Sequence, residues 1–477
     1  MGKSISAIYI WVLLLCTALL CAYNIGNGFG EDSDSVRMVE AAHTSFRLHQ
    51  LLPSRSWGYP LYEACVYPLI YFFSPHLLPA KMLSLLLVLG TAWLMFGILR
   101  RLQLSASSAL LLGIIFVCHP LVIIAGNAIL ETCMSLFFVV WILYYTIGLL
   151  LQQRLTLANY LCYGVLFGLA TLARPDNMLY FPSLFILLLL RRRLNIAYTL
   201  ASGICLLAIG IVPYFLVHYP LFQKLASNAS QPLLRGIKDI IGIFGLFLIA
   251  ALAGWIVYFL SRSRAAWQKA FRWKDDVFLF TSIFSVIVLA RVMKMSDELE
   301  YGLAIWPLFI ILLALLVREL SSGVPARTTN VFMASVLVAT LLPNFIQVYF
   351  FREVNFEYKF SPGLTAGVFK QEKKRRVLNE EIYRTGIQVL EQASDSLRNK
   401  SIDYKIHLLY DPCDSCVVLT GVRDLKLYKK TSHGRGTDLA HHRIVFSPDF
   451  NISRGWRNFI RDSYIPPFSE KHLVLQY

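Results

Sequence analysis

Stretches of about 20 apolar residues recur along the first 350 positions, and they constrain the fold of this chain more than any other feature. An α-helix of that length just crosses the hydrocarbon core of a bilayer. The composition agrees, because 56% of the 477 residues are hydrophobic and only 16% are charged. A typical soluble domain carries about 25% charged residues. The chain is therefore predicted to be a polytopic α-helical membrane protein.

The apolar runs predict about eleven transmembrane helices. The first run is long, further spans follow it and Ala22-Tyr23-Asn24 is a poor cleavage site, so it is predicted to be a retained helix and not a signal peptide. The predicted helices cover residues 7–23, 80–99, 106–124, 132–151, 157–173, 178–190, 196–217, 237–260, 276–292, 301–317 and 329–350.

The basic residues indicate how the chain is oriented in the membrane. A net charge of +16 on a soluble chain would suggest nucleic acid, but here the basic excess sits in alternate short loops, so no nucleic-acid partner is predicted. Cytoplasmic loops are enriched in lysine and arginine. With the N-terminus in the cytoplasm of a plasma or inner membrane, the inner loops hold Arg100, Arg101, Arg154, Arg191, Arg192, Arg193, Arg262, Arg264, Lys269, Arg272, Lys274, Arg318 and Arg327.

Two longer polar regions fall on the outer side in this orientation. Residues 24–79 are longer than an ordinary loop between two helices. Their stretches 35–51 and 62–73 are predicted to be helices in the plane of the membrane interface. Residues 351–477 are predicted to form a small extracytoplasmic α/β domain, with a helix over 375–398 and strands at 405–410, 416–419 and 443–446. Cys413 and Cys416 form a lone CxxC, which leaves a structural disulfide as an open alternative.

An acidic cluster, Glu31-Asp32-Ser33-Asp34, follows the first apolar run directly. Placing carboxylates near hydrocarbon costs free energy, so the cluster is expected to have a specific role or to be solvated. One interpretation is a solvated acidic loop. The other is a catalytic base that faces a lipid-borne substrate at the membrane surface.

Further polar residues gather on the same predicted outer side. Glu131 starts a predicted helix, where a carboxylate is also favourable with the helix dipole. Arg174 lies in the tripeptide Arg174-Pro175-Asp176, which could equally be a turn with an Arg–Asp pair. The other candidates on this side are Arg55, Tyr59, Asn127, Lys294 and Tyr301.

Taken in order, these segments resemble the C-type (GT-C) membrane glycosyltransferases, nearest to the branch of protein O-mannosyltransferases and lipid A aminoarabinose transferase. The likeness covers about residues 7–350, and the region after 351 matches no family in the same way. Where the aminoarabinose branch has a lysine before a proline this chain has Tyr59, and where many members have arginine before a tyrosine it has Glu300. The matching segments are Asp34 to Ala42, His119-Pro120 with Glu131, Ser56 to Glu63, Arg174-Pro175 and Lys294 to Leu308.

The resemblance implies a GT-C-like enzyme that moves a hexosyl or pentosyl group, with inversion, from a polyprenyl-phosphate donor to an acceptor hydroxyl at the outer face. The acceptor is a lipid, a glycan or a protein. Asp34 would be the general base, and Glu131 would be a second catalytic acid that orients the acceptor or the sugar. Donor-phosphate contacts fall to Arg174, Lys294, Arg55 and Tyr59, and orienting contacts to Arg37, Asn127 and Tyr301. No metal is required, although Asp34 and Glu131 could hold Mg²⁺ or Mn²⁺.

Two other classes of function compete with this interpretation. A lipid or solute transporter or flippase would place ionisable groups near the midplane of the bilayer and often shows internal repeats. Here the charges gather at one interface and no repeat is found. A non-catalytic scaffold that presents residues 351–477 would have no need of Asp34.

Overall fold

A computed structural model gives the fold of the chain, in two units that are described separately. The first unit comprises Met1–Gly26, Arg37–Val348 and Leu364–Phe369, and the second Asn27–Val36, Tyr349–Gly363 and Lys370–Tyr477. The structure describes residues 2–26, 35, 38–39, 41–42, 45–46, 49, 51–54, 58–73, 77–153, 155–214, 240–262, 272, 275–295, 302–354, 357–371, 373, 404–410, 415–421 and 442–445.

The first unit is built from long apolar helices, and each predicted apolar run contains a described helix. Five segments are long and apolar enough to cross a membrane: Leu78–Arg101, Thr132–Gln152, Ile196–Tyr214, Asp276–Met293 and Ala326–Asn344. The mostly helical membrane architecture is thus confirmed, and the count of eleven crossings stays a prediction. The helices are α1 Gly2–Ile25, α4 Leu78–Arg101, α5 Ala106–Val117, α7 Thr132–Gln152, α8 Leu157–Ala173, α9 Pro182–Leu190, α10 Ile196–Leu206, α14 Leu246–Arg262, α16 Asp276–Met295, α17 Ile305–Gly323 and α18 Ala326–Leu341.

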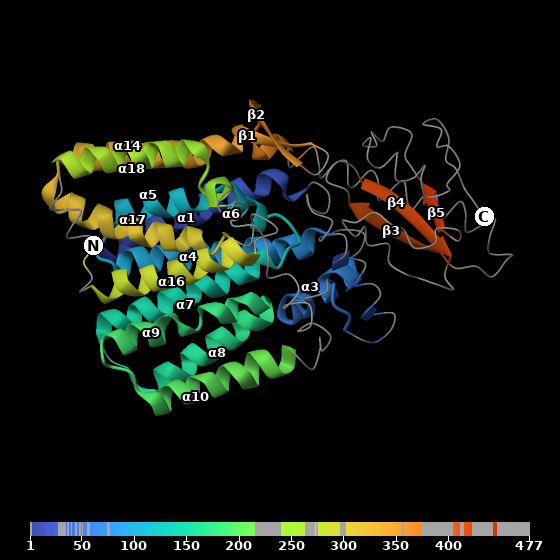
Figure 1. Cartoon of the computed structure of the whole chain (residues 1–477), viewed down its shortest axis with the longest axis horizontal. Helices are drawn as coiled ribbons and strands as arrows, with labels where there is room; N and C mark the ends of the chain where they lie inside the picture. Colours follow the sequence, from blue (N-terminus) through green and yellow to red (C-terminus); the bar gives the residue numbers. More distant parts are fainter. Residues whose placement is uncertain are drawn as a thin grey trace. The chain divides into compact units, whose positions relative to one another are not determined.

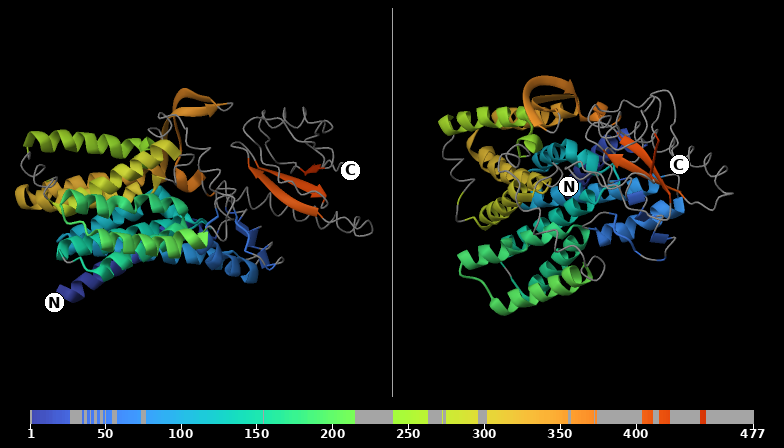
Figure 2. Two further views of the ribbon diagram at one scale, coloured as in Figure 1. Left: turned by 60° about the horizontal axis from the view of Figure 1, so that its bottom comes forward. Right: turned by 45° about the vertical axis from the view of Figure 1, so that its right-hand side comes forward.

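These helices pack side by side (Figures 1 and 2). Helix α4 lies between α1 and α7, and α8 lies between α7 and α10. Helix α16 packs on α9 and α17, and α14 packs on α18. The buried faces of these helices are almost wholly apolar, with large side chains such as Trp306, Phe116 and Phe167 fully enclosed.

Polar groups tie several helix ends together at one end of this bundle. The indole N–H of Trp306 at the start of α17 donates to the Phe116 carbonyl near the end of α5, at 2.9 Å. The Asn344 amide after α18 donates to the Cys118 carbonyl at 2.8 Å. The Lys81 ammonium at the start of α4 donates to the Ile25 carbonyl at the end of α1, at 2.9 Å. The ends of α1, α5 and α18 therefore lie at the same end of the bundle as the starts of α4 and α17.

Several predicted helices are interrupted. The run 106–124 breaks at His119, because Pro120 lacks an N–H and instead starts α6, Pro120–Ala125. The run 178–190 begins with the 3₁₀ helix η1, Pro175–Tyr180, and 196–217 contains the π-helical turn η2, Leu207–Ile211. The run 237–260 breaks at Gly245, whose φ is +69°.

The predicted helix over 329–350 is too long. Helix α18 ends at Leu341, and the 3₁₀ turn η5, Leu342–Asn344, contains Pro343. The chain then forms strand β1, Ile346–Val354, which pairs with β2, Glu357–Ala366. The aromatic and β-branched residues after Pro343 favour a strand at least as well as a helix. This hairpin was not predicted.

The second unit contains an antiparallel three-stranded sheet in the order β3–β4–β5. Strands β3, Tyr404–Tyr410, β4, Ser415–Gly421, and β5, His442–Val445, lie where strands were predicted. Leu409 pairs with Cys416, and Leu419 pairs with Arg443. Nearly all of the predicted helix over 375–398, like Cys413, lies outside the described residues, so the α/β domain and the disulfide stay predictions.

Of the two predicted interfacial helices, the second is helical as α3, Pro60–Phe73, and its place at the membrane interface stays a prediction. Its side chains Tyr62, Val66 and Ile70 are buried on one side, while Phe72 and Phe73 are exposed. In the first, over 35–51, the described residues Ser35, Met38, Val39, Ala41, Ala42, Ser45 and Phe46 are helical.

Candidate functional site

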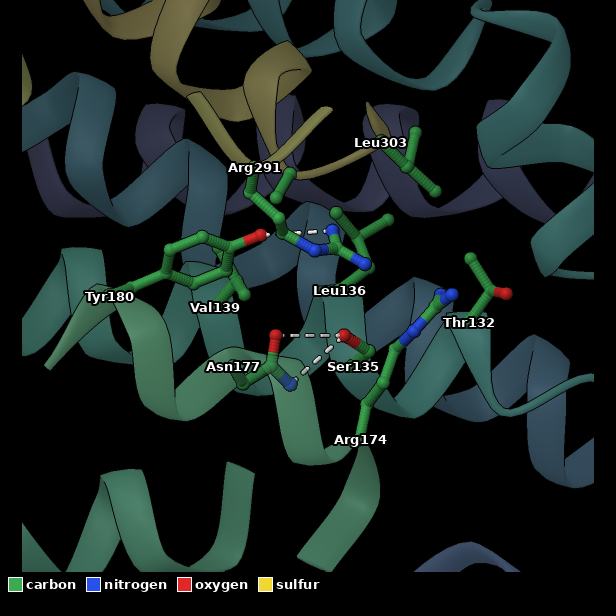
Figure 3. A pocket seen from close by; sticks show the side chains of 10 residues that line it. Thr132, Ser135, Leu136, Val139, Arg174, Asn177, Tyr180, Arg291 and Leu303 are labelled. Atoms are coloured by element: carbon green, nitrogen blue, oxygen red, sulfur yellow. Dashed lines mark hydrogen bonds between the residues drawn. The ribbon is translucent and has the colours of Figure 1, made fainter. Parts of the chain in front are cut away.

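A buried network of arginines and one carboxylate joins η1 to α16, and Figure 3 shows three of its members, Arg174, Arg291 and Tyr180. Arg174 ends α8 and is only 4% exposed; its Nε lies 3.4 Å from Oδ1 of Asp176. Arg291, near the end of α16, pairs through Nη2 with Oδ2 of the same carboxylate. Its Nη1 also donates to the Tyr180 hydroxyl at 3.0 Å. The Arg–Asp pair expected for the turn is present, and Arg291 extends it into a network.

A small cavity lies beside this network. Asn177 and Ser135 exchange hydrogen bonds across it, at 3.0 and 3.2 Å, and the Asn177 amide also donates to the Ala170 carbonyl at 2.9 Å. Its volume of about 10 Å³ suits a single water molecule. The lining residues are Thr132, Ser135, Leu136, Val139, Arg174, Asn177, Tyr180, Arg291, Leu303 and Ala304 (Figure 3).

The chemistry of this network suits an anionic group. Arginine presents planar donors that bind phosphate in a bidentate manner, and it keeps its charge when buried. Two such guanidinium groups converge here, at the end of α8 and near the end of α16. A phosphate is larger than the cavity, so it would contact the rim or displace side chains.

Glu131 adjoins the cavity through its neighbour Thr132. It occupies the cap position of α7 and is 0% exposed. Its side chain makes no capping hydrogen bond, so capping by that route does not explain it. Its charge acts on Tyr62 and Glu63 of α3, which places the three side chains in one neighbourhood.

Glu63 is a second fully buried carboxylate. Its Oε1 accepts two hydrogen bonds from Ser54, from the backbone N–H at 2.8 Å and from the hydroxyl at 2.7 Å. Burial raises the pKa of this carboxyl above its ordinary value, the Ser54 bonds oppose the change, and the charge of Glu131 adds to it. Two buried acids therefore lie within electrostatic reach of each other.

The structure brings together only part of the predicted site. Arg174 lines the cavity, and Glu131 directly precedes Thr132, which also lines it. Tyr59 and Asn127 are both buried, at 2% and 1% exposure, next to α3 and α7 respectively. Lys294 lies in α16, although its side chain is outside the described part of the chain. Asp34, Arg37, Arg55 and Tyr301 are likewise outside it, so their roles stay predictions.

Arg291 and Glu63 were missed in the sequence, although a signal was present. Each is an ionisable residue in an otherwise apolar helix, Arg291 in SVIVLARVMKM and Glu63 in PLYEACVYPLIYFF. Such a residue is a candidate site residue by default. Lys294, one turn after Arg291, was predicted as the donor-binding residue of this helix instead.

A metal site needs several converging ligands. Among the residues that the structure describes, no three His, Cys, Asp or Glu side chains form such a group. Of the two acids that could hold a divalent ion, Glu131 is described and Asp34 is not.

Comparison with known proteins gives a likeness in structure alone. No protein-family model matches the sequence, and no curated protein matches it significantly. Among solved structures, ArnT from Cupriavidus metallidurans in the apo state aligns with a TM-score of 0.50 over 69% of this chain and 62% of ArnT, at 14% identity. The chain has the fold of ArnT.

A second ArnT structure from the same organism, bound to undecaprenyl phosphate, aligns with a TM-score of 0.48 at 14% identity, over 72% of this chain and 71% of ArnT. At this identity the likeness to ArnT concerns the fold only. The ArnT fold and the five membrane-length apolar segments together make this chain an integral membrane protein.

Proposed function

We propose that this protein is an integral membrane glycosyltransferase. It transfers a sugar from a polyprenyl-phosphate donor to an acceptor hydroxyl at the extracytoplasmic face, with inversion at the anomeric carbon. The observation that carries the proposal is the gathering of Arg174, Arg291 and Glu131 at one end of an apolar helix bundle. A lipid substrate with a charged headgroup needs this combination of apolar walls and buried charge.

The other end of the bundle differs in kind. Its basic residues pair with acids at the start of α16: Arg191 Nε lies 2.6 Å from Asp276, and Arg318 Nη2 lies 3.5 Å from Asp275. These side chains are partly exposed. This difference supports a catalytic site at the end of the bundle that holds the Arg174 network. The charges at the other end would set the orientation in the membrane.

In the proposed reaction Asp34 accepts the proton of the acceptor hydroxyl. The acceptor oxygen forms a bond to the anomeric carbon while the bond from that carbon to the donor phosphate breaks. The polyprenyl phosphate leaves with the electron pair. A carboxylate is an adequate base because the proton moves as the new bond forms.

The departing phosphate carries the developing charge. Guanidinium and ammonium groups stabilise such charge when they are held in place beforehand. Arg174 with its network partner Arg291 is proposed for this role, together with Lys294, Arg55 and Tyr59. Undecaprenyl phosphate is bound in the ArnT structure, and for this chain a polyprenyl-phosphate donor is what its resemblance to the GT-C family implies.

Other parts of the proposal follow from the sequence. Glu131, with Arg37, Asn127 and Tyr301, orients the acceptor or the sugar. The reaction requires no metal, although a divalent ion between Asp34 and Glu131 is compatible with it. Residues 1–350 form the catalytic membrane domain, and residues 351–477 form an extracytoplasmic α/β domain.

The substitution Asp34→Asn tests the proposal, with Asp32→Asn in the same acidic cluster as its control. We expect Asp34→Asn to lower sugar transfer from a polyprenyl-phosphate donor by about 100-fold or more, since general-base catalysis contributes that much. Donor binding should persist, and Asp32→Asn should retain transfer. Normal transfer by a folded Asp34→Asn variant would overturn the assignment. Substrate flux in proteoliposomes without a new glycosidic bond would identify a transporter instead.

A further inference from the structure

Two polar side chains, one helical turn apart on α3, hold the chain segment that precedes the helix. Glu63 binds Ser54 through two hydrogen bonds, and the Tyr67 hydroxyl donates to the Leu52 carbonyl at 2.8 Å. The Leu52 N–H in turn donates to the Ser45 hydroxyl at 3.0 Å. The backbone of residues 52–54 is therefore fixed at three points.

Glu63 also holds the chain at a second position. Besides the ordinary helical bond from the Glu63 N–H to the Tyr59 carbonyl, at 2.8 Å, the Tyr59 backbone hydrogen-bonds the Glu63 carboxyl and opposes the rise in its pKa. Ser54 and Tyr59 thus both bond to the Glu63 carboxyl, which holds the chain at these two residues. Gly58, just before Tyr59, has a φ of +59°, which glycine adopts without strain. The turn back to α3 depends on that conformation.

Candidates for donor binding lie at or beside these two residues in the sequence. One is Tyr59 itself, and Arg55 follows Ser54 directly. A buried carboxylate is costly unless its hydrogen bonds are made, and here one oxygen accepts two. Breaking either bond would leave buried polar groups without partners, which is unfavourable. The two bonds therefore fix the position of Ser54 relative to Glu63.

We propose that Glu63 is a positioning residue: its carboxylate holds Ser54 and Tyr59, and so sets where Tyr59 meets the phosphate group of a lipid-linked sugar donor. The inference rests on the proposed function. Glu63 acts through hydrogen bonds and not through proton transfer. An amide oxygen accepts the same two bonds, so glutamine replaces it and alanine does not.

The kinetic test compares Glu63→Ala with Glu63→Gln. We expect Glu63→Ala to raise the KM for the polyprenyl-phosphate donor about tenfold, with a smaller change in kcat, because two hydrogen bonds are lost. Glu63→Gln should restore the KM to within about threefold of wild type. Tyr163→Phe is the control: it removes a buried hydroxyl that donates to the Phe181 carbonyl at 3.0 Å in the α8 region and should leave the KM unchanged.

Hydrogen exchange gives a readout that does not depend on catalysis. In detergent or nanodiscs, the peptide that covers residues 51–59 should exchange faster in Glu63→Ala, since the Ser54 amide loses its acceptor, and at the wild-type rate in Glu63→Gln. If Glu63→Ala does not fold, Ser54→Ala removes the hydroxyl bond alone and should raise the KM in the same direction by less.

Two results would overturn the inference. One is a Glu63→Gln variant as impaired as Glu63→Ala, which would assign the residue a charge or proton role. The other is an unchanged KM together with unchanged exchange in Glu63→Ala. If the wild-type protein transfers no sugar, the proposed function fails, whereas the exchange experiment still decides whether Glu63 holds Ser54.

Discussion

Arg291 links two parts of the chain that are far apart in sequence. Its guanidinium reaches Asp176 and the Tyr180 hydroxyl, so α16 is fastened to η1 by charge as well as by packing. Asp176 is only 15% exposed. The charge of this largely buried carboxylate is compensated by its arginine partners, because little water reaches it.

Arg291→Gln should therefore destabilise the protein. Removing one partner of a buried ion pair costs about 3 kcal/mol, since it leaves the other charge poorly compensated. Arg193→Gln is the matched control, because Arg193 is 54% exposed and lies 3.3 Å from Asp276. An exposed pair of this kind contributes less than about 1 kcal/mol. Thermal unfolding in detergent measures both, and equal losses in the two variants would contradict a buried network.

Neighbouring residues in the network were predictable from the sequence, and distant ones were not. Arg174 and Asp176 share one turn, so their pairing is a local property. Arg291 meets Tyr180 across 111 positions of sequence. A single sequence contains no signal for which face of α16 packs on which hairpin. Its charge in an apolar helix marks Arg291 as a candidate without naming its partner.

Among the helices, α8 and α10 pack unusually close. A methyl group added at Gly164 of α8 would lie 2.3 Å from the Ser202 carbonyl oxygen of α10, and one at Gly168 would lie 2.9 Å from Ile209. The two glycines are spaced four residues apart, as in the Gly-x-x-x-Gly contacts of membrane helices. The absence of side chains is what lets the two backbones approach.

Gly164→Ala should push these helices apart. The nearest atom is backbone and not a flexible side chain, so we expect a loss of about 1–3 kcal/mol from overpacking. Gly203→Ala, on α10 itself, meets nothing within 4 Å and should be neutral or stabilising by up to about 1 kcal/mol. Thermal unfolding of the two variants makes the comparison. A neutral Gly164→Ala would show that the contact is looser than described.

The helices were predictable from apolar periodicity, and their interruptions only in part. Pro120 and Pro343 are visible in the sequence and account for the breaks at His119 and after α18. Strand β1 is different, because Gln347 to Phe351 is as compatible with a helix as with a strand when only hydrophobicity is considered. Pairing with β2 decides the outcome, and that pairing is a tertiary effect.

In the molecule as a whole, charge separates the two ends of the bundle. The arginines after α9 and α17 pair with Asp275 and Asp276 at one end, and the Arg174 network lies at the other. The positive-inside rule assigns the first of these ends to the cytoplasm. The proposed donor site is then predicted to be extracytoplasmic, where a sugar carried on a lipid is a suitable substrate.

Labelling of single cysteines with a membrane-impermeant maleimide tests this orientation, in a background where all nine native cysteines, including the exposed Cys65 and Cys162, are serine. Arg193→Cys and Lys370→Cys are suitable positions because both residues are exposed. We expect Lys370→Cys to react in intact cells and Arg193→Cys to react only after permeabilisation, since an odd number of crossings separates them. The reverse pattern would place the Arg174 network on the cytoplasmic side. Reaction of both cysteines from one side would mean an even number of crossings between α9 and residue 370, which would break the alternation on which the assignment of the site depends.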